Sequence, residues 1–286
     1  MSITVETLDA PLGAVLAGVD GRKKLPDRDL QSIEQALLEH LVVVIPDVED
    51  DVDWLLDVGR RFGPLVPHIL TRFHHPKTSE MSIISANMDN VESRETVQPA
   101  GAFWHSDLSY CRDPSDAIFL HATHVPSDGG DTSIANMQRA YEALPDSLRK
   151  AIGELTATHR YGWGGKGAIT EPDPERRAQY PDVVHPVVRV HARTGRRSLF
   201  VNPGYTMCIN GVSRDESDAI LGELFAHSRR DEFCYRHRWA VGQLVVIDNR
   251  ATLHCALADY REPMRKLRMI VGCTERDTPD AGNLLN

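Results

Sequence analysis

Short strand-like segments separated by turn residues run through most of this chain and limit the folds it can adopt. The clearest is Leu41–Ile45, an apolar run stopped by Pro46, which is typical of a buried strand. Many short strands in a chain that also contains a few helices favour a barrel or jelly roll flanked by helices. The other candidate strands are 12–16, 81–85, 103–109, 118–125, 131–135, 187–191, 198–202, 244–248 and 269–274.

Helical periodicity predicts helices between these strands. Asp27 or Asp29 is expected to cap the first helix. Pro145 separates two helices in the middle of the chain. The run Ser213-Arg214-Asp215-Glu216 is a capping-box pattern that opens the last helix. The expected helices are 27–41, 52–62, 136–144, 146–155 and 214–229.

Nothing in the sequence divides the 286 residues into separate units. We therefore expect a single domain over residues 1–286, with a mixed α/β part at about 1–80 packed on the strand-rich core. Residues 162–182 are rich in Gly and Pro and long for a loop. They are either a lid or binding loop, or a disordered insert.

Composition narrows the classes of partner. The chain has 32 basic and 41 acidic residues, a formal net charge of −9, which argues against general nucleic-acid binding. No apolar run is long enough for a membrane span, and the first residues do not resemble a signal peptide. The five cysteines are scattered and form no CxxC pair. We expect a cytoplasmic protein with a small-molecule substrate, no nucleic-acid or membrane partner, and homo-oligomerisation left open.

The segment Phe103-Trp104-His105-Ser106-Asp107 suggests metal chemistry. Side chains alternate along a strand, so His105 and Asp107 would point to the same side if 103–109 is a strand. One imidazole, one carboxylate and a distant imidazole make the set that suits non-haem Fe(II) and leaves coordination positions open. Among thirteen histidines His254 is the best third ligand, because it follows a strand and a polar turn.

Several blocks of sequence in a characteristic order strengthen this interpretation. They are Trp104–Asp107, Pro126–Thr132, Ala140–Leu144, Leu199–Asn202 and Asp248–His254. In these blocks the chain resembles the taurine dioxygenase and 2,4-dichlorophenoxyacetate dioxygenase family of Fe(II)/2-oxoglutarate enzymes, and the resemblance covers most of its length. It implies an α+β fold with a double-stranded β-helix (jelly roll) core flanked by helices.

The resemblance implies Fe(II), 2-oxoglutarate as co-substrate, and O2. Carried over to this chain, it makes His105, Asp107 and His254 the iron ligands. The predicted activity is hydroxylation or desaturation of a small organic acid or amino-acid-derived metabolite, including steps in secondary metabolism, with release of succinate and CO2. Related halogenases have a small residue in place of the carboxylate, so Asp107 disfavours halogenation.

The resemblance also suggests how 2-oxoglutarate is held. Thr132 would hydrogen-bond its distal carboxylate, and Arg265 would form an ion pair with the same group. Arg268 is the alternative if the alignment shifts slightly in this segment. These polar residues favour an oxygenase over two other classes, a cupin-like metal-binding protein and a zinc hydrolase, whose metal also suits two histidines and one aspartate.

The substrate pocket is expected to be less polar than that of the taurine enzyme. Met269 stands where the taurine enzyme has the arginine that binds sulfonate. Phe103 before the motif and Tyr205 after the Leu199–Asn202 block suggest room for an aromatic or amphiphilic substrate. His74 or His75, expected in a loop, is a candidate contact to the substrate, as a histidine of this region is in the taurine enzyme.

Overall fold

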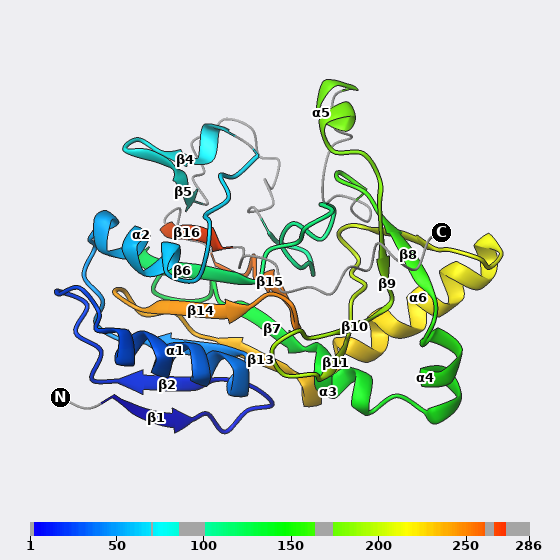
Figure 1. Cartoon of the computed structure of the whole chain (residues 1–286), viewed down its shortest axis with the longest axis horizontal. Coiled ribbons are helices and arrows are strands. Elements are labelled where there is room, and N and C mark those ends of the chain that lie inside the picture. Colours follow the sequence, from blue (N-terminus) through cyan, green and yellow to red (C-terminus); the bar gives the residue numbers. More distant parts are fainter. Residues whose placement is uncertain (1–2, 70, 86–100, 164–173, 261–265, 273–286) are drawn as a thin grey trace.

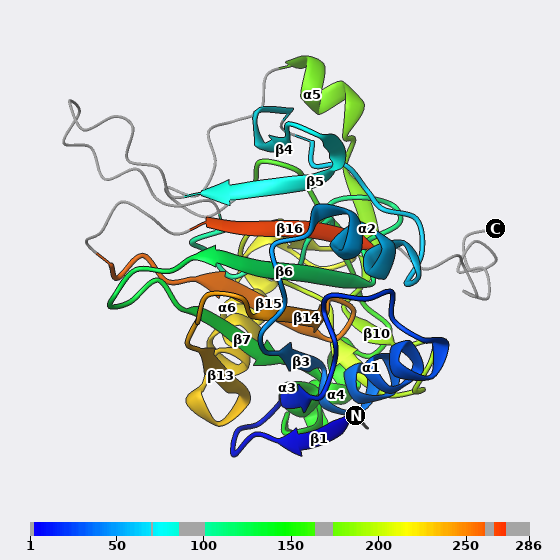
Figure 2. The same ribbon diagram turned by 90° about the vertical axis from the view of Figure 1, so that its left-hand side faces the viewer.

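The computed structural model describes residues 3–69, 71–85, 101–163, 174–260 and 266–272. Its largest sheet has eight strands, and every neighbouring pair is antiparallel except β2 and β3. Figure 2 shows β5, β16 and β6 side by side in this sheet. In spatial order the strands are β1 (Thr4–Thr7), β2 (Ala14–Ala17), β3 (Val42–Ile45), β14 (Leu244–Asp248), β6 (Ala117–His124), β16 (Lys266–Gly272), β5 (Thr78–Ser85) and β4 (His74–His75).

A second group of antiparallel strands packs behind the large sheet. Its centre is β13 (Cys234–His237), β7 (Thr132–Asn136) and β15 (Thr252–Ala256), with β7 in the middle. The remaining strands are β12 (Thr206–Ile209), β8 (Thr156–His159) and β9 (Val183–Pro186) in one sheet, and β10 (Val188–Val190) with β11 (Arg197–Leu199) in another.

The central strands of the large sheet are buried on both faces, which explains their continuous apolar sequences. Alternate residues of β3 belong to different cores: Val43 packs in a core with the first two helices, and Val44 in a core with the second group of strands. The same alternation separates Val246 from Val245 in β14. The large sheet therefore lies between a helical layer and a second β layer.

Helices cover the two outer sides of these layers (Figure 1). The core beneath α1 and α2 contains Leu37 and Leu55. A separate core joins α3, α4 and α6 to the outer face of the second β layer, through residues such as Leu224 and Leu253. The helices are α1 (Asp27–His40), α2 (Val52–Arg60), α3 (Met137–Glu142), α4 (Asp146–Ile152), α5 (Pro174–Gln179) and α6 (Arg214–Ser228).

The two predicted helix caps have different outcomes. The Ser213 hydroxyl accepts a hydrogen bond from the Glu216 backbone N–H, as the capping-box pattern predicts. The expectation that Asp27 or Asp29 caps α1 is wrong. Pro26 is the cap residue, and its carbonyl accepts hydrogen bonds from the first turn. Both aspartates lie inside that turn, where their charge favours the helix dipole.

Residues 103–109 do not form the predicted strand. Within them, His105 makes a single antiparallel bridge with His254, and the chain then turns at Leu108, whose φ is 56°. The backbone N–H and carbonyl of Asp107 are bonded to the side chain of Asn249 instead of to a neighbouring strand. Local alternation could not predict this, because the partner lies far away in the sequence.

Two other expectations concern segments near the edge of the fold. His74 and His75 form the short edge strand β4 rather than a loop. In the 162–182 segment, residues 174–179 form α5, and residues 164–173 lie outside the described part of the chain. Its role as a lid or an insert stays a prediction. Among the described residues, no helix is both long enough and apolar enough to cross a membrane.

Candidate active site

Three side chains of the predicted metal set meet where the 101–116 loop docks on β15. His105 and Asp107 come from the loop, and His254 comes from β15. The two histidines exchange backbone hydrogen bonds, with N···O distances of 3.0 Å and 2.8 Å. Their ring centroids are 4.2 Å apart. The backbone bridge thus sets the spacing of the two imidazoles.

The Asp107 carboxylate faces both rings. Its Oδ1 lies 3.4 Å from His105 Nε2, and its Oδ2 lies 4.0 Å from His254 Nε2. One ligand atom from each of the three residues lies within 4.8 Å of the others. Asp107 Oδ2 is buried and accepts no hydrogen bond from the residues that the structure describes. A buried carboxylate oxygen in this state is costly unless a cation compensates it, so the three residues fit a divalent metal ion.

The His105 ring is oriented by its own backbone. Nδ1 lies 2.7 Å from the Phe103 carbonyl oxygen, which can only accept a hydrogen bond. Nδ1 must therefore carry the proton, and in the neutral ring Nε2 keeps its lone pair on the side of Asp107. Metal-binding histidines are commonly oriented by such a contact to a carbonyl.

Opposing effects act on the Asp107 carboxyl. Burial raises its pKa, but the contact with His105 and the charges of His254 and His68 lower it to about 2. The group is therefore held as a carboxylate, which is the form that binds a metal. His68 was not selected from the sequence, because a single histidine in an irregular segment has no motif around it.

Aromatic side chains form one wall of the site. The Phe103 ring lies 4.7 Å from the His105 ring and 5.9 Å from that of Tyr205. Tyr110 lies 4.7 Å from Tyr205 and 5.0 Å from Tyr161. We call Phe103, Tyr110, Tyr161 and Tyr205 the aromatic wall. The sequence predicted Phe103 and Tyr205 as pocket residues. It did not predict Tyr110 and Tyr161, which reach the site only through the fold.

Two tyrosines of the aromatic wall are kept neutral, and the wall packs close to the ligands. Burial, followed by the charges of neighbouring groups including Asp107, raises the pKa of both Tyr110 and Tyr205 well above the usual value. A Cβ added at Gly204 would lie 2.5 Å from Phe103 Cε2 and 3.2 Å from His105 Cβ. Glycine at this position therefore allows the Phe103 ring to pack beside the first ligand.

Thr132 lies on the same face of the second β layer as His254. His254 pairs with Ile134, and Ala256 pairs with Thr132. Because side chains two residues apart on a strand point to the same face, Thr132 and His254 share a face. Thr132 is 2% exposed, and its Oγ1 accepts a hydrogen bond of 3.1 Å from Trp239 Nε1. The hydroxyl is thus oriented by an indole that the sequence analysis did not select.

The remaining predicted residues are only partly placed. Arg265 lies outside the described residues. Arg268 and Met269 are consecutive in β16, paired with His121 and Leu120 of β6, and their side chains are not described. His74 Nε2 lies 2.7 Å from the His68 carbonyl oxygen. Of these two histidines, His68 is the one whose charge contributes to the low pKa of Asp107.

Comparison with known proteins identifies the family. Residues 4–274 match the model described as "Taurine catabolism dioxygenase TauD, TfdA family". The chain belongs to the TauD/TfdA family. This family member is 32% identical over 266 residues to the alpha-ketoglutarate-dependent 2,4-dichlorophenoxyacetate dioxygenase of Cupriavidus pinatubonensis, an alignment that covers 89% of this chain and 92% of the relative.

Two further comparisons agree. The TauD/TfdA chain is 33% identical over 276 residues to pentalenolactone F synthase of Streptomyces avermitilis, with 91% of this chain and 90% of the relative covered. It is similar to the crystal structure of a taurine dioxygenase from Burkholderia xenovorans, with a TM-score of 0.81, 30% identity, and coverage of 96% and 90%.

The comparisons confirm the predicted class of enzyme. This TauD/TfdA protein is an oxidoreductase, a 2-oxoglutarate-dependent dioxygenase that acts on small organic compounds and uses Fe(II), 2-oxoglutarate and O2. They support this function over the cupin-like and zinc-hydrolase alternatives. The fold is confirmed at the level of mixed helices and sheets shared with these dioxygenases.

Proposed function

We propose that His105, Asp107 and His254 hold the Fe(II) of this dioxygenase, and that it hydroxylates or desaturates a small organic acid or amino-acid-derived metabolite with an aromatic or other apolar portion. The observation that carries the proposal is the meeting of three ligand atoms within 4.8 Å beside the aromatic wall. Phe103 links the proposed metal centre to the aromatic wall. Its ring packs on that of His105, and its carbonyl oxygen lies 2.7 Å from His105 Nδ1.

Each residue of the set has a separate task. His105 offers Nε2 because its Nδ1 proton is directed at a carbonyl, and Asp107 offers a carboxylate whose Oδ2 accepts no hydrogen bond from any described residue. His254 completes the set from β15. Three protein ligands leave positions for small molecules. Fe(II) held there would supply the oxidising chemistry, in which O2 and 2-oxoglutarate are consumed and succinate and CO2 are released.

We assign the distal carboxylate of 2-oxoglutarate to Thr132, together with Arg265 or Arg268. The support is positional: Thr132 is buried on the same face of the second β layer as His254. Trp239 Nε1 donates to Thr132 Oγ1 at 3.1 Å, and this bond helps to orient the hydroxyl. An arginine is suited to the same carboxylate because its guanidinium can bind two oxygens at once.

The aromatic wall defines the proposed substrate class. Tyr110 and Tyr205 are neutral phenols, so they can pack against an aromatic or aliphatic group and donate hydrogen bonds without adding charge. His74 is the proposed contact for the substrate acid; its Nε2 lies 2.7 Å from the carbonyl oxygen of His68, which contributes to the low pKa of Asp107. Met269, at the position of the sulfonate-binding arginine, argues against taurine itself.

We also propose the type of core, the domain organisation and the cellular location of the enzyme. We infer that the eight-stranded sheet and β13-β7-β15 form the jelly-roll core of a single domain over residues 1–286, because a shared apolar core lies between them. The part at about 1–80 contributes β1, β2 and β3 to the large sheet. We place the enzyme in the cytoplasm, where the four free cysteines described here stay reduced.

Anaerobic titration tests the cofactor assignment. Wild-type protein mixed with Fe(II) and 2-oxoglutarate should develop a visible metal-to-ligand charge-transfer band, and His254→Ala should not. Absence of the band in wild type contradicts the proposal. Succinate release should then be measured with aryloxy, aromatic and aliphatic acids and with taurine. The substrate proposal predicts coupled release with an apolar acid, and preferential turnover of taurine would contradict it.

A further inference from the structure

The side chain of Asn249 replaces a neighbouring strand at Asp107. Asn249 Oδ1 accepts a hydrogen bond of 3.0 Å from the Asp107 backbone N–H, and Nδ2 donates one of 2.8 Å to the Asp107 carbonyl. The two residues are 142 positions apart. The contact uses both the backbone N–H and the backbone carbonyl of Asp107, as a paired residue of a neighbouring strand would. It occurs just after His105, the residue that forms the single bridge with β15.

Further bonds join Asn249 to both sides of Asp107. Its Nδ2 lies 2.9 Å from the Ser115 carbonyl and 2.7 Å from the Ser115 hydroxyl. Its backbone N–H donates to the Asp116 carbonyl, and its own carbonyl accepts from the Ser106 hydroxyl at 3.0 Å. Asn249 is only 1% exposed, so these bonds do not compete with water. One residue therefore ties residues 106–107 to the end of the loop at 115–116.

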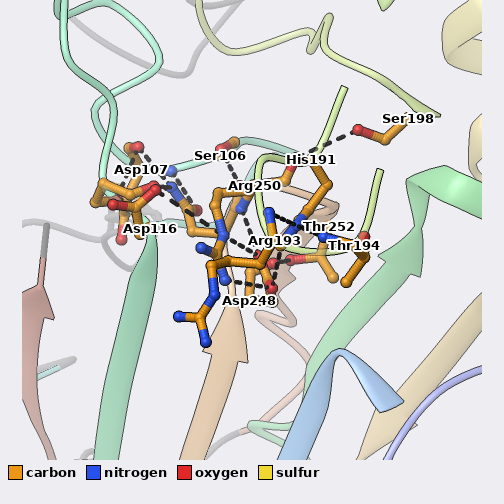
Figure 3. A network of polar contacts seen from close by, with 12 residues as sticks. Ser106, Asp107, Asp116, His191, Arg193, Thr194, Ser198, Asp248, Arg250 and Thr252 are labelled. Atoms are coloured by element: carbon orange, nitrogen blue, oxygen red, sulfur yellow. Dashed lines mark hydrogen bonds and ion pairs between the residues drawn. The ribbon is translucent and has the colours of Figure 1, made fainter. Parts of the chain in front are cut away.

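The turn that carries Asn249 is itself held by a buried charge network (Figure 3). The Asp248 carboxylate has no exposed surface, and it accepts hydrogen bonds from His191 Nε2 at 2.9 Å and from Arg250 Nε and Nη2 at 3.0 Å and 2.8 Å. The Thr252 hydroxyl donates to the Asp248 carbonyl at 2.7 Å. The same turn leads directly into β15, which carries His254.

Through these contacts the short segment from Asp248 to Ala256 determines the positions of two proposed metal ligands. Residues 252–256 place His254, and the Asn249 amide places the backbone of Asp107. Within the described part of the chain no hydrogen bond orients Asp107 Oδ2, so the direction of the carboxylate depends on its backbone and on the contact with His105. Leu108, next in the chain, has a left-handed φ of 56°, a conformation that is unfavourable for leucine without outside contacts.

We propose that Asn249 is a positioning residue of the metal centre. Its amide holds the Asp107 backbone so that the carboxylate faces the two imidazoles, and it thereby sets the affinity for the divalent metal as well as the stability of the loop. The inference rests on the proposed assignment of His105, Asp107 and His254 as ligands. Groups that orient metal ligands typically change metal affinity by about 10–100-fold when removed.

Two substitutions distinguish loss of the whole Asn249 amide from loss of its N–H donors alone. Asn249→Ala removes the whole contact. Asn249→Asp keeps the shape and the acceptor oxygen but has no N–H to donate to Asp107 and Ser115. Anaerobic titration of each variant with Fe(II), and with Mn(II) as a probe stable in air, gives the metal dissociation constant without any turnover. Both variants should bind metal about 10–100-fold more weakly than wild type.

Asn136→Ala is the matched control. Asn136 is 4% exposed, and its side chain accepts from the Gln138 and Arg139 backbone N–H groups and donates to the Pro11 carbonyl. It should lower the free energy of unfolding, like Asn249→Ala, while the metal dissociation constant stays within about twofold of wild type. An equal weakening of metal binding in Asn136→Ala overturns the proposal, because loss of stability would then explain the effect.

Ser115→Ala keeps the test decisive if Asn249→Ala does not fold. It removes the hydroxyl that lies 2.7 Å from Asn249 Nδ2 and 3.2 Å from the Asp107 carbonyl, and a smaller loss of metal affinity is expected. Wild-type affinity in every folded variant overturns the positioning role while leaving the ligand assignment intact. Wild-type affinity in Asp107→Ala as well overturns the ligand assignment itself, and the positioning role with it.

Discussion

His105 and His254 bond to each other through their backbones, with N···O distances of 3.0 Å and 2.8 Å, and their imidazole rings lie 4.2 Å apart. An irregular loop is thereby anchored to a strand at the residue that bears the first ligand. The loop turns immediately afterwards, so Asp107 is placed by contacts to other segments. The predictions below test these contacts and the packing around them.

Removing the Asp248 carboxylate should be strongly destabilising. The group has no exposed surface and neutralises Arg250 while accepting a hydrogen bond from His191, so its loss leaves the buried guanidinium with the more distant Asp116 carboxylate, 3.9 Å from Nε. Asp248→Ala should lower the free energy of unfolding by about 3–5 kcal/mol in urea denaturation. Asp218→Ala, which breaks the exposed pair with Arg214, should cost less than about 1 kcal/mol. Equal effects would contradict this account.

Gly204 should tolerate no side chain. Gly204→Ala places a Cβ 2.5 Å from the Phe103 ring, which must move against His105, and the overpacking should cost about 1–3 kcal/mol of unfolding free energy. In Gly222→Ala the new Cβ meets open space on an exposed turn of α6, and stability should rise by about 0.5–1 kcal/mol. Thermal unfolding of both variants provides the measurement, and a neutral Gly204→Ala would refute the packing argument.

The indole N–H of Trp239 should matter for 2-oxoglutarate. Trp239→Phe removes the indole donor to Thr132 Oγ1 and so weakens the orientation of the hydroxyl. Loss of one such bond, worth about 1 kcal/mol, should raise the KM for 2-oxoglutarate about fivefold without changing the metal dissociation constant. Trp54→Phe is the control, since its N–H donates to the Lys23 carbonyl in the core beneath α1 and α2. An unchanged KM in Trp239→Phe would remove the role assigned to Trp239.

Two buried histidines should make stability depend on pH. Burial and then the charge of His185 lower the pKa of His159 to about 3, and burial lowers that of His185 to about 4. In the unfolded chain both titrate near about 6.5. Below that pH the unfolded state binds more protons, so this stabilisation is complete above about pH 6.5 and declines as the pH falls toward the two folded-state pKa values.

Urea denaturation between pH 7 and 5 checks this dependence. Each neutral buried histidine should contribute a loss of up to about 1.4 kcal/mol per pH unit below about pH 6.5. His159→Gln should reduce the slope by about half, while His124→Gln, at an exposed position, should leave it unchanged. A wild-type slope that is flat over this range would show that the two imidazoles are protonated in the native state.

Local patterns were sufficient for much of the framework. The apolar run of β3 and that of β14 predict buried strands because continuous burial depends on composition over a few residues. The capping box at Ser213 predicts the start of α6 because its partner is three residues away. The order of residue types around His105 and His254 also predicted the family, which the comparisons confirm. Each of these signals lies within a short stretch of chain.

Only the tertiary structure decided how the site is built. The predicted strand at 103–109 is wrong because Asn249, 142 positions from Asp107, takes the backbone bonds that a strand neighbour would have made. Tyr110 and Tyr161 join the aromatic wall, and His68 acts on Asp107, through contacts that no local pattern records. The sequence by itself determined which ligand types are present and which segments bear them. Their direction, protonation and surroundings come from long-range docking, because those properties depend on groups that meet only in the folded chain.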